Sequence, residues 1–306
     1  MHLHAFGLDT PERISSKFVG VLGLLTLLCS GGGLQAAVVI DLGTLGGASK
    51  ASAINASTQS AGQSDVASGN THAFLWTNGV MTDLGTLGGS SSYGFDVSHS
   101  GQVVGRSLTG VGTSYHAFVW QNGAMTDLGT FGGSSSIAFG INDNNSVVGW
   151  ADSTSGGFFP ALWQNGTITN LGSLGGGFGG ASKINNLGQA VGWSYTGSSI
   201  FHAFSWQNGL MTNLGTLGGA DSQATAVNDA GQIVGWSDLT GAPHHAFVLQ
   251  NGIMSDLGTF GGNNSIAQNN NSLGQVVGWA ETANNTRHAF VWQNGSLTDL
   301  NDVVAL

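Results

Sequence analysis

A glycine-rich phrase that returns along almost the whole chain is the feature that most constrains its fold. Asp-Leu-Gly-Thr-Leu-Gly-Gly begins at Asp41 and again at Asp83. Variants of the phrase begin at Asp127, Asn170, Asn213 and Asp256, and a shortened copy begins at Asp299. Successive copies start 42 to 44 residues apart, so six units of about 43 residues fill the chain after residue 37. Repeats of this length bury their apolar surfaces only by stacking on their neighbours.

Each unit contains four short runs that predict β-strands. In the unit 127–170 the runs cover residues 136–142, 146–150, 159–164 and 167–171. They are rich in β-branched, aromatic or small residues and are bounded by Gly, Asn and Asp, as strands are. No window after residue 36 has the long 3.6-residue apolar period of a helix. We therefore expect strands and almost no helix.

An Asn-Gly dipeptide separates the third and fourth runs of every unit. The six copies are Asn78-Gly79, Asn122-Gly123, Asn165-Gly166, Asn208-Gly209, Asn251-Gly252 and Asn294-Gly295. Both central residues of a type I′ turn need a positive φ, which Asn and Gly tolerate best. The pattern predicts a tight antiparallel hairpin in each unit.

Four antiparallel strands every 40 to 45 residues are typical of a propeller blade. The sequence therefore predicts an all-β fold, a six-bladed β-propeller of four-stranded antiparallel blades, as one domain over residues 37–306. The alternative is another all-β repeat such as a solenoid, whose coils generally repeat every 20 to 30 residues or so. Ring closure stays open, because the fourth strand has seven copies, counting residues 38–43, and the others six.

The first 36 residues have the pattern of a secretory signal peptide. Arg13 and Lys17 precede an apolar run over residues 18–29, and small residues lead to a cleavage site that we place near Ala36. An apolar run of that length is short for a membrane span, which needs about 20 residues. We expect secretion, or display on a bacterial cell surface, without membrane insertion of the mature chain. Cys29, the one cysteine, lies in this segment.

Two motifs recur together at fixed spacing: His-Ala-Phe-x-Trp-x-Asn-Gly, then Asp-Leu-Gly-Thr-Leu-Gly-Gly. Through them residues 38–301 resemble the HAF-family extracellular repeat proteins of bacteria. The resemblance implies export and a repeat architecture, and it implies no activity. The third unit departs from the pattern with Pro160-Ala161-Leu162.

Composition excludes several classes of partner. Charged residues make up 7% of the chain, and the formal net charge is −10. A nucleic-acid partner is not expected, because binding one requires a basic patch. No glycine-rich nucleotide-binding motif opens a helix, and no cofactor is expected. The oxygen-rich segment Asn142-Asp143-Asn144-Asn145 lacks the calcium-binding loop pattern, so we interpret it as a turn and expect no metal site.

The histidine of each motif has a structural interpretation. Histidines spaced one per blade on the third strand lie too far apart to share a metal ion. We expect each to form a hydrogen bond within its own blade, to the Asp or Asn of the neighbouring strand. Asn replaces Asp at 170 and 213, which favours a turn contact over acid catalysis. The structural positions are His72, His116, His202, His245 and His288, with Asp83, Asp127 and Asp256.

A second set of side chains marks a candidate ligand surface. One residue near the end of each second strand is aromatic or cationic in five units: Arg106, Trp150, Trp193, Trp236 and Trp279. Exposed aromatic rings can stack on sugar rings, although packing between blades explains them as well. The loops between the second and third strands also vary from unit to unit, whereas the other turns are uniform. Binding residues tend to lie on variable loops held by a rigid frame.

These observations favour a non-catalytic binding module that holds a glycan or protein ligand on the variable-loop face. One alternative is a structural matrix or surface scaffold protein. The other is a carbohydrate-active enzyme, which requires two carboxylates about 5 to 10 Å apart at the propeller axis. No local spacing in the sequence pairs such carboxylates, so no catalytic residue is predicted.

Overall fold

A computed structural model describes residues 40–110, 113–197, 199–241 and 243–302, and the candidate signal peptide lies outside these ranges. Chain contacts divide the protein after Asp41, and the unit Leu42–Leu306 contains all of the sheets. The described residues form 24 strands and no helix, so no helix that could cross a bilayer occurs among them.

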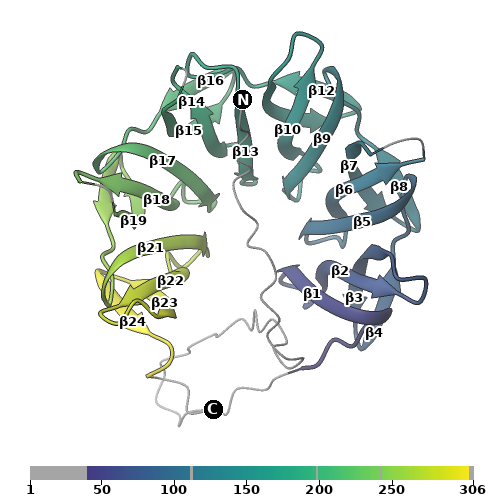
Figure 1. Ribbon diagram of the computed structural model, residues 1–306, viewed down its shortest axis with the longest axis horizontal. Coiled ribbons are helices and arrows are strands. Elements are labelled where there is room, and N and C mark those ends of the chain that lie inside the picture. The colour runs from purple at the N-terminus through teal and green to yellow at the C-terminus, as the bar shows by residue number, and fades with distance from the viewer. Residues whose placement is uncertain (1–39, 111–112, 198, 242, 303–306) are drawn as a thin grey trace. The chain divides into compact units, whose positions relative to one another are not determined.

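The strands form six antiparallel sheets of four, which are the predicted blades (Figure 1). Blade 1 is β1 (Gly46–Ile54), β2 (Ser60–Val66), β3 (Thr71–Thr77) and β4 (Val80–Asp83); blade 2 is β5 (Gly88–Val97), β6 (Val103–Thr109), β7 (Tyr115–Gln121) and β8 (Ala124–Asp127); blade 3 is β9 (Gly132–Ile141), β10 (Val147–Ser153), β11 (Phe158–Gln164) and β12 (Thr167–Asn170). Blade 4 is β13 (Gly179–Ile184), β14 (Ala190–Tyr195), β15 (Phe201–Gln207) and β16 (Leu210–Asn213); blade 5 is β17 (Gly218–Val227), β18 (Ile233–Leu239), β19 (His244–Gln250) and β20 (Ile253–Asp256); blade 6 is β21 (Gly261–Asn270), β22 (Val276–Thr282), β23 (Arg287–Gln293) and β24 (Ser296–Asp299).

Every sheet takes its four strands in sequence order. The fold class predicted from the repeats, an all-β propeller with four-stranded antiparallel blades, is therefore confirmed. Because β24 completes the last sheet, no strand is exchanged between the first and last blades within the described residues.

The predicted hairpin turns are also confirmed. Asn251 and Gly252 have φ values of 53° and 78°, and both residues of the other five Asn-Gly pairs have positive φ as well. These turns lie on the same side of the blades as the turns between first and second strands, and we call this side the turn face. The connections from second to third strands lie on the opposite side, which we call the loop face.

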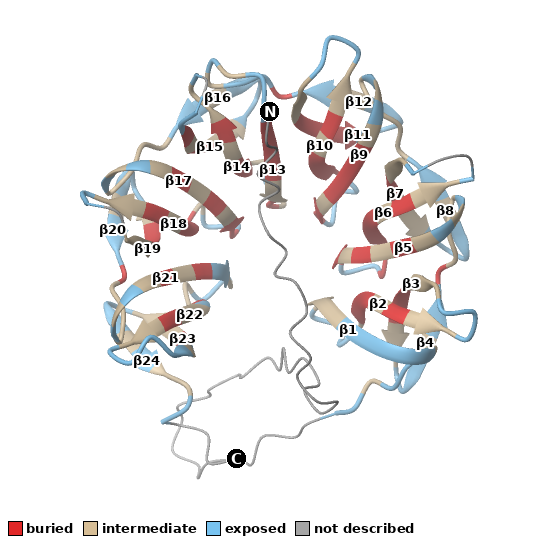
Figure 2. Ribbon diagram, viewed as in Figure 1, coloured by how far each residue is buried: buried red, intermediate tan, exposed pale blue. Residues whose placement is uncertain are grey.

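The core lies between blades rather than within them. Five clusters of buried apolar residues each combine side chains of two consecutive blades. In the cluster between blades 4 and 5, for example, Val191 and Ala203 pack against Val227, Ile233 and Phe247. The third-strand tryptophans of blades 2, 3, 4 and 6 pack at these interfaces, with Leu249 taking the same role in blade 5. Among the inner strands, burial is most extensive in the middle blades, on β9 and β13 (Figure 2).

A glycine at the centre of each second strand lets the strands approach closely. Opposite it the first strand has a β-bulge, as between Ala224 and Ala226 in blade 5. A Cβ at Gly235 would collide with the Gln223 carbonyl oxygen, so no larger residue fits there. The phenylalanine of the repeat motif pairs with this glycine across the sheet, as Phe247 does with Gly235, and it is fully buried.

Candidate functional site

The histidine of the repeat motif lies beside the first residue of the glycine-rich phrase in its own blade. The Nδ1 atom of His72 is 2.9 Å from the Asp83 carboxylate, and that of His116 is 2.8 Å from Asp127. His202, His245 and His288 make the same contact with Asn213, Asp256 and Asp299. The hydrogen bond expected from the sequence is present in each of these five blades.

The same Asp or Asn also organises the turn that follows it. Asp83 Oδ1 accepts a hydrogen bond at 2.8 Å from the Gly85 backbone N–H, and Asn213 Oδ1 does the same for Gly215. An amide oxygen serves this purpose as well as a carboxylate, which explains why Asn is tolerated. Within the described residues no group of three or more His, Cys, Asp or Glu side chains could hold a metal ion.

The residues predicted to contact a ligand lie on the second strands, and all of them are half-buried: Arg106, Trp150, Trp193, Trp236 and Trp279. Each is the fourth residue of its strand, so it lies near the middle of the strand and not near the end as the sequence suggested. A residue that begins the third strand, directly after the variable loop, lies next to each of them. These loops are four or five residues long, so they differ mainly in composition and less in length than the sequence suggested.

The side chains join into a continuous line that we call the aromatic row. It consists of Trp150, Phe158, Trp193, Phe201, Trp236, His244 and Trp279. Second-strand and third-strand residues alternate along it, and ring centroids are 4.9 to 6.4 Å apart. These distances are usual for interacting aromatic pairs. The row therefore brings the four predicted tryptophans together across blades 3 to 6.

Titratable groups beside the row are shifted by their surroundings. Burial lowers the pKa of His244, although the carboxylates of Asp238 and Glu281 oppose the shift. Burial likewise raises the pKa of Asp238, against the effect of its backbone hydrogen bond from Asp221. In both cases partial removal from water favours the neutral form of the side chain.

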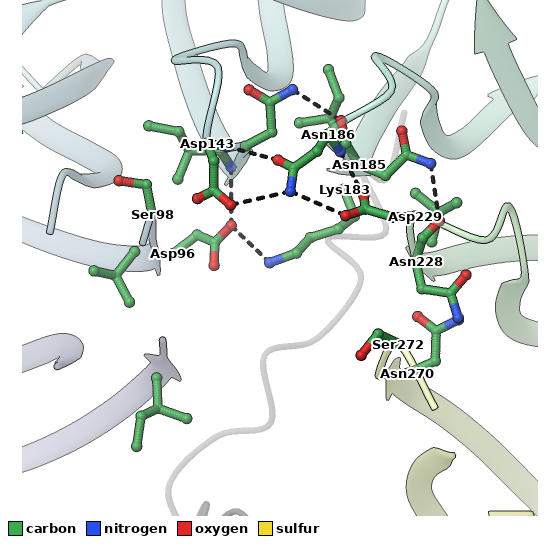
Figure 3. Close-up of a pocket in the computed structure, with 16 residues that line it drawn as sticks. Asp96, Ser98, Asp143, Lys183, Asn185, Asn186, Asn228, Asp229, Asn270 and Ser272 are labelled. Carbon is green, nitrogen blue, oxygen red and sulfur yellow. Dashed lines mark hydrogen bonds and ion pairs between the residues drawn. The ribbon is translucent and has the colours of Figure 1, made fainter. Parts of the chain in front are cut away.

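A second site, which sequence reasoning missed, lies where the turns between first and second strands converge (Figure 3). The cavity has a volume of about 260 Å³ and is lined mainly by polar side chains. Lys183 of blade 4 extends past blade 3 and forms an ion pair with Asp96 of blade 2, with Nζ 2.7 Å from Oδ2. Asp96 also accepts a hydrogen bond from the Ile141 backbone N–H of blade 3. One carboxylate thus ties three blades together.

Asparagines in the same turns connect successive blades. The Asn142 Nδ2 donates to the Asn185 carbonyl, Asn185 to that of Asn228, and Asn228 to that of Asn271, at 2.8 to 2.9 Å. The Asn142 Oδ1 meanwhile accepts from two N–H groups of its own turn. The interpretation of residues 142–145 as a turn is confirmed, because the Asn142 N–H bonds to Ser146 and Asn145 has a φ of 61°.

Two carboxylates from different blades share one hydrogen-bond donor near the cavity. The Asn186 Nδ2 group donates to Asp143 and to Asp229, at 3.1 Å in each case. Figure 3 shows the Asn186 side chain between the two carboxylates. Each of these carboxylates also accepts a backbone N–H of a neighbouring blade, from His99 and Asn186 respectively. The contacts of Asp96, Asp143 and Asp229 therefore explain them as links between blades.

Comparisons with known proteins support the fold. No family model matches the chain, and no curated protein does. Among solved structures, it is similar to the β-propeller domain of the Trilobed protease from Pyrococcus furiosus, described as having an open velcro topology. That match has 10% identity and a TM-score of 0.56, and it covers 82% of this chain and 81% of the other.

Two further solved structures are similar over most of this chain. TolB from Acinetobacter baumannii has 13% identity and a TM-score of 0.52, with 78% of this chain and 61% of TolB covered. The Pyrococcus horikoshii acylaminoacyl peptidase has 10% identity and a TM-score of 0.51, with 79% and 43% covered. This chain thus spans about three fifths of TolB and less than half of the peptidase. At these identities the likeness establishes a propeller fold.

Proposed function

We propose that this protein is an exported, non-catalytic member of the HAF repeat family that binds a glycan on its loop face. The aromatic row is the observation that carries the proposal. Six of its seven rings are half-buried, so each of these is fixed by its neighbours while part of it stays accessible, and Phe201 is buried between Trp193 and Trp236. The C–H faces of sugar rings pack favourably on fixed aromatic faces through dispersion contacts.

The row also has the extent that binding an oligosaccharide requires. It crosses four blades without interruption, so several sugar units can be contacted in sequence. Polar groups that can orient a sugar lie beside it, including His244 within the row and Asp238 at the end of β18. A mainly aromatic surface with a few placed polar groups is typical of ligand sites.

The test is a binding screen of the purified protein against a microarray of defined neutral and acidic oligosaccharides, followed by calorimetry. We expect Trp236→Ala to weaken binding of the selected glycan at least tenfold, because it interrupts the row at its centre. Trp236→Phe keeps a ring and should recover most of the affinity. Leu210→Ala, a site 68% exposed on the turn face, serves as the control. An array without signal, or affinity unchanged in a folded Trp236→Ala variant, would refute the proposal.

A further inference from the structure

Arg106 takes the place in blade 2 that tryptophan has in blades 3 to 6. Its guanidinium carbon lies 4.5 Å from the ring centroid of Tyr115 and 5.0 Å from that of Tyr93. Phe95 is a third ring, at 5.9 Å. Cations within about 6 Å of aromatic faces are attracted by the ring quadrupole. The rings therefore hold the guanidinium in place on the loop face.

No acidic group in the described ranges forms an ion pair with this charge. Arg106 has no ion pair and no hydrogen bond within the described part of the chain, and its Nε is buried without an acceptor. Lys183 provides the contrast, since its ammonium group is paired with Asp96. A guanidinium has five N–H donors, and here none of them has an acceptor among the residues that the structure describes.

The residue two positions after Arg106 explains why the guanidinium has no carboxylate partner. In four other blades an acidic residue stands two positions after the residue equivalent to Arg106: Asp65, Asp152, Asp238 and Glu281. Blade 2 has Leu108 there, paired with Tyr115 across the sheet. The blade that has the cation is thus one of the two without an acid at this position, blade 4 with Tyr195 being the other.

We propose that Arg106, with Tyr93 and Tyr115, binds the anionic group of a glycan, a carboxylate or a sulfate ester. The planar guanidinium matches both groups through paired N–H donors. The chain has a formal charge of −10, so a cation left unpaired among rings is a specific feature and not part of a basic surface. This inference rests on the proposed function, and it adds the chemical class of the ligand.

The experiment compares charged and neutral forms of the same sugar. Calorimetry would use the purified protein with oligogalacturonate and its neutral methyl ester, and with a sulfated oligosaccharide and its unsulfated parent. We expect at least tenfold tighter binding of one or both anionic forms, and the pair that shows it identifies the group. Arg106→Gln should abolish this preference and leave the neutral sugar within about twofold.

Two variants make the test specific. Arg106→Trp introduces the residue that blades 3 to 6 have at this position, so it should remove the anionic preference while keeping neutral binding. Arg287→Gln is the matched control, because Arg287 also lies over a ring, 4.2 Å from Trp279, but in blade 6. A preference that survives Arg106→Gln, or one lost in Arg287→Gln instead, would overturn the inference. If binding of the neutral sugar depends on Trp236 but the anionic forms bind no more tightly, this inference is overturned. The proposed function would still stand.

Discussion

Single residues on opposite sides of a blade interface depend on one another. The Ala203 backbone N–H donates to the Ser222 Oγ of the next blade at 2.9 Å, and Ala73, Ala117 and Ala246 make the same bond. Pro160 replaces this alanine in blade 3 and has no N–H to donate. In the following blade Gly179 replaces the serine, and a Cβ there would lie 3.2 Å from the Pro160 Cδ. The two departures from the repeat are therefore one paired change.

A double-mutant cycle tests this pairing. Gly179→Ser alone should destabilise the fold, since its side chain meets the proline ring and the backbone of Trp193. Pro160→Ala alone leaves a buried N–H without an acceptor, at a cost of about 1 to 3 kcal/mol. The double variant restores the bond found at four other interfaces, so we expect a favourable coupling of about 1 to 2 kcal/mol in urea unfolding. Additive effects of the two changes would contradict the pairing.

The sequence predicted contacts within a blade but not contacts between distant blades. His72 and Asp83 lie in one hairpin, 11 residues apart, so a local argument was sufficient. Asp96 and Lys183 are 87 residues apart and meet across blade 3. They meet beside Gly140, where a Cβ would lie 3.1 Å from the Lys183 Cα. Such a contact follows from how the blades are arranged around their centre, which no local pattern encodes.

At the scale of the element, the glycines of a blade serve different purposes. The turns could be predicted because positive φ requires particular residues, and Asn-Gly supplies them. The first-strand bulges were not predicted, because a bulge depends on the partner strand. Gly252 needs its positive φ and has open space around it, whereas Gly235 has an ordinary φ and no space for a Cβ.

Alanine substitutions separate these two roles. Gly252→Ala should cost about 1 to 2 kcal/mol, the strain of placing an L-residue in the left-handed region. Gly235→Ala should cost roughly 3 kcal/mol or more, because the Gln223 backbone would have to move and the packing of Phe247 would change. Thermal and urea unfolding of both variants provides the measurement, and equal losses would contradict the assignment.

At the scale of the whole molecule, stability depends on position in the series of blades. All the larger contacts between sheets join sequence neighbours, and each of the five interfaces has its own core cluster. Val104, Val148, Val191 and Val234 are fully buried by the following blade. Val277, at the equivalent position of blade 6, is 37% exposed because no further sheet packs on it within the described residues.

Equivalent valines should therefore differ in their contribution to stability. Val234→Ala removes two methyl groups from a closed interface and should cost about 2 kcal/mol. Val277→Ala should cost less than about 0.5 kcal/mol, as surface substitutions usually do. Equilibrium unfolding of the two variants measures the difference. A loss at Val277 as large as that at Val234 would mean that another surface covers the last blade in solution.

The paired change at Pro160 and Gly179 also affects how repeats can be gained or lost during evolution. A deletion with breakpoints at Asp127 and Asn170 would remove Pro160 but leave Gly179 opposite the Ala117 N–H, which would then lack its serine acceptor. Breakpoints at the equivalent glycines 149 and 192 would remove both residues and preserve every such bond. The unit that recombination can transfer without damage therefore runs from the middle of one blade to the middle of the next.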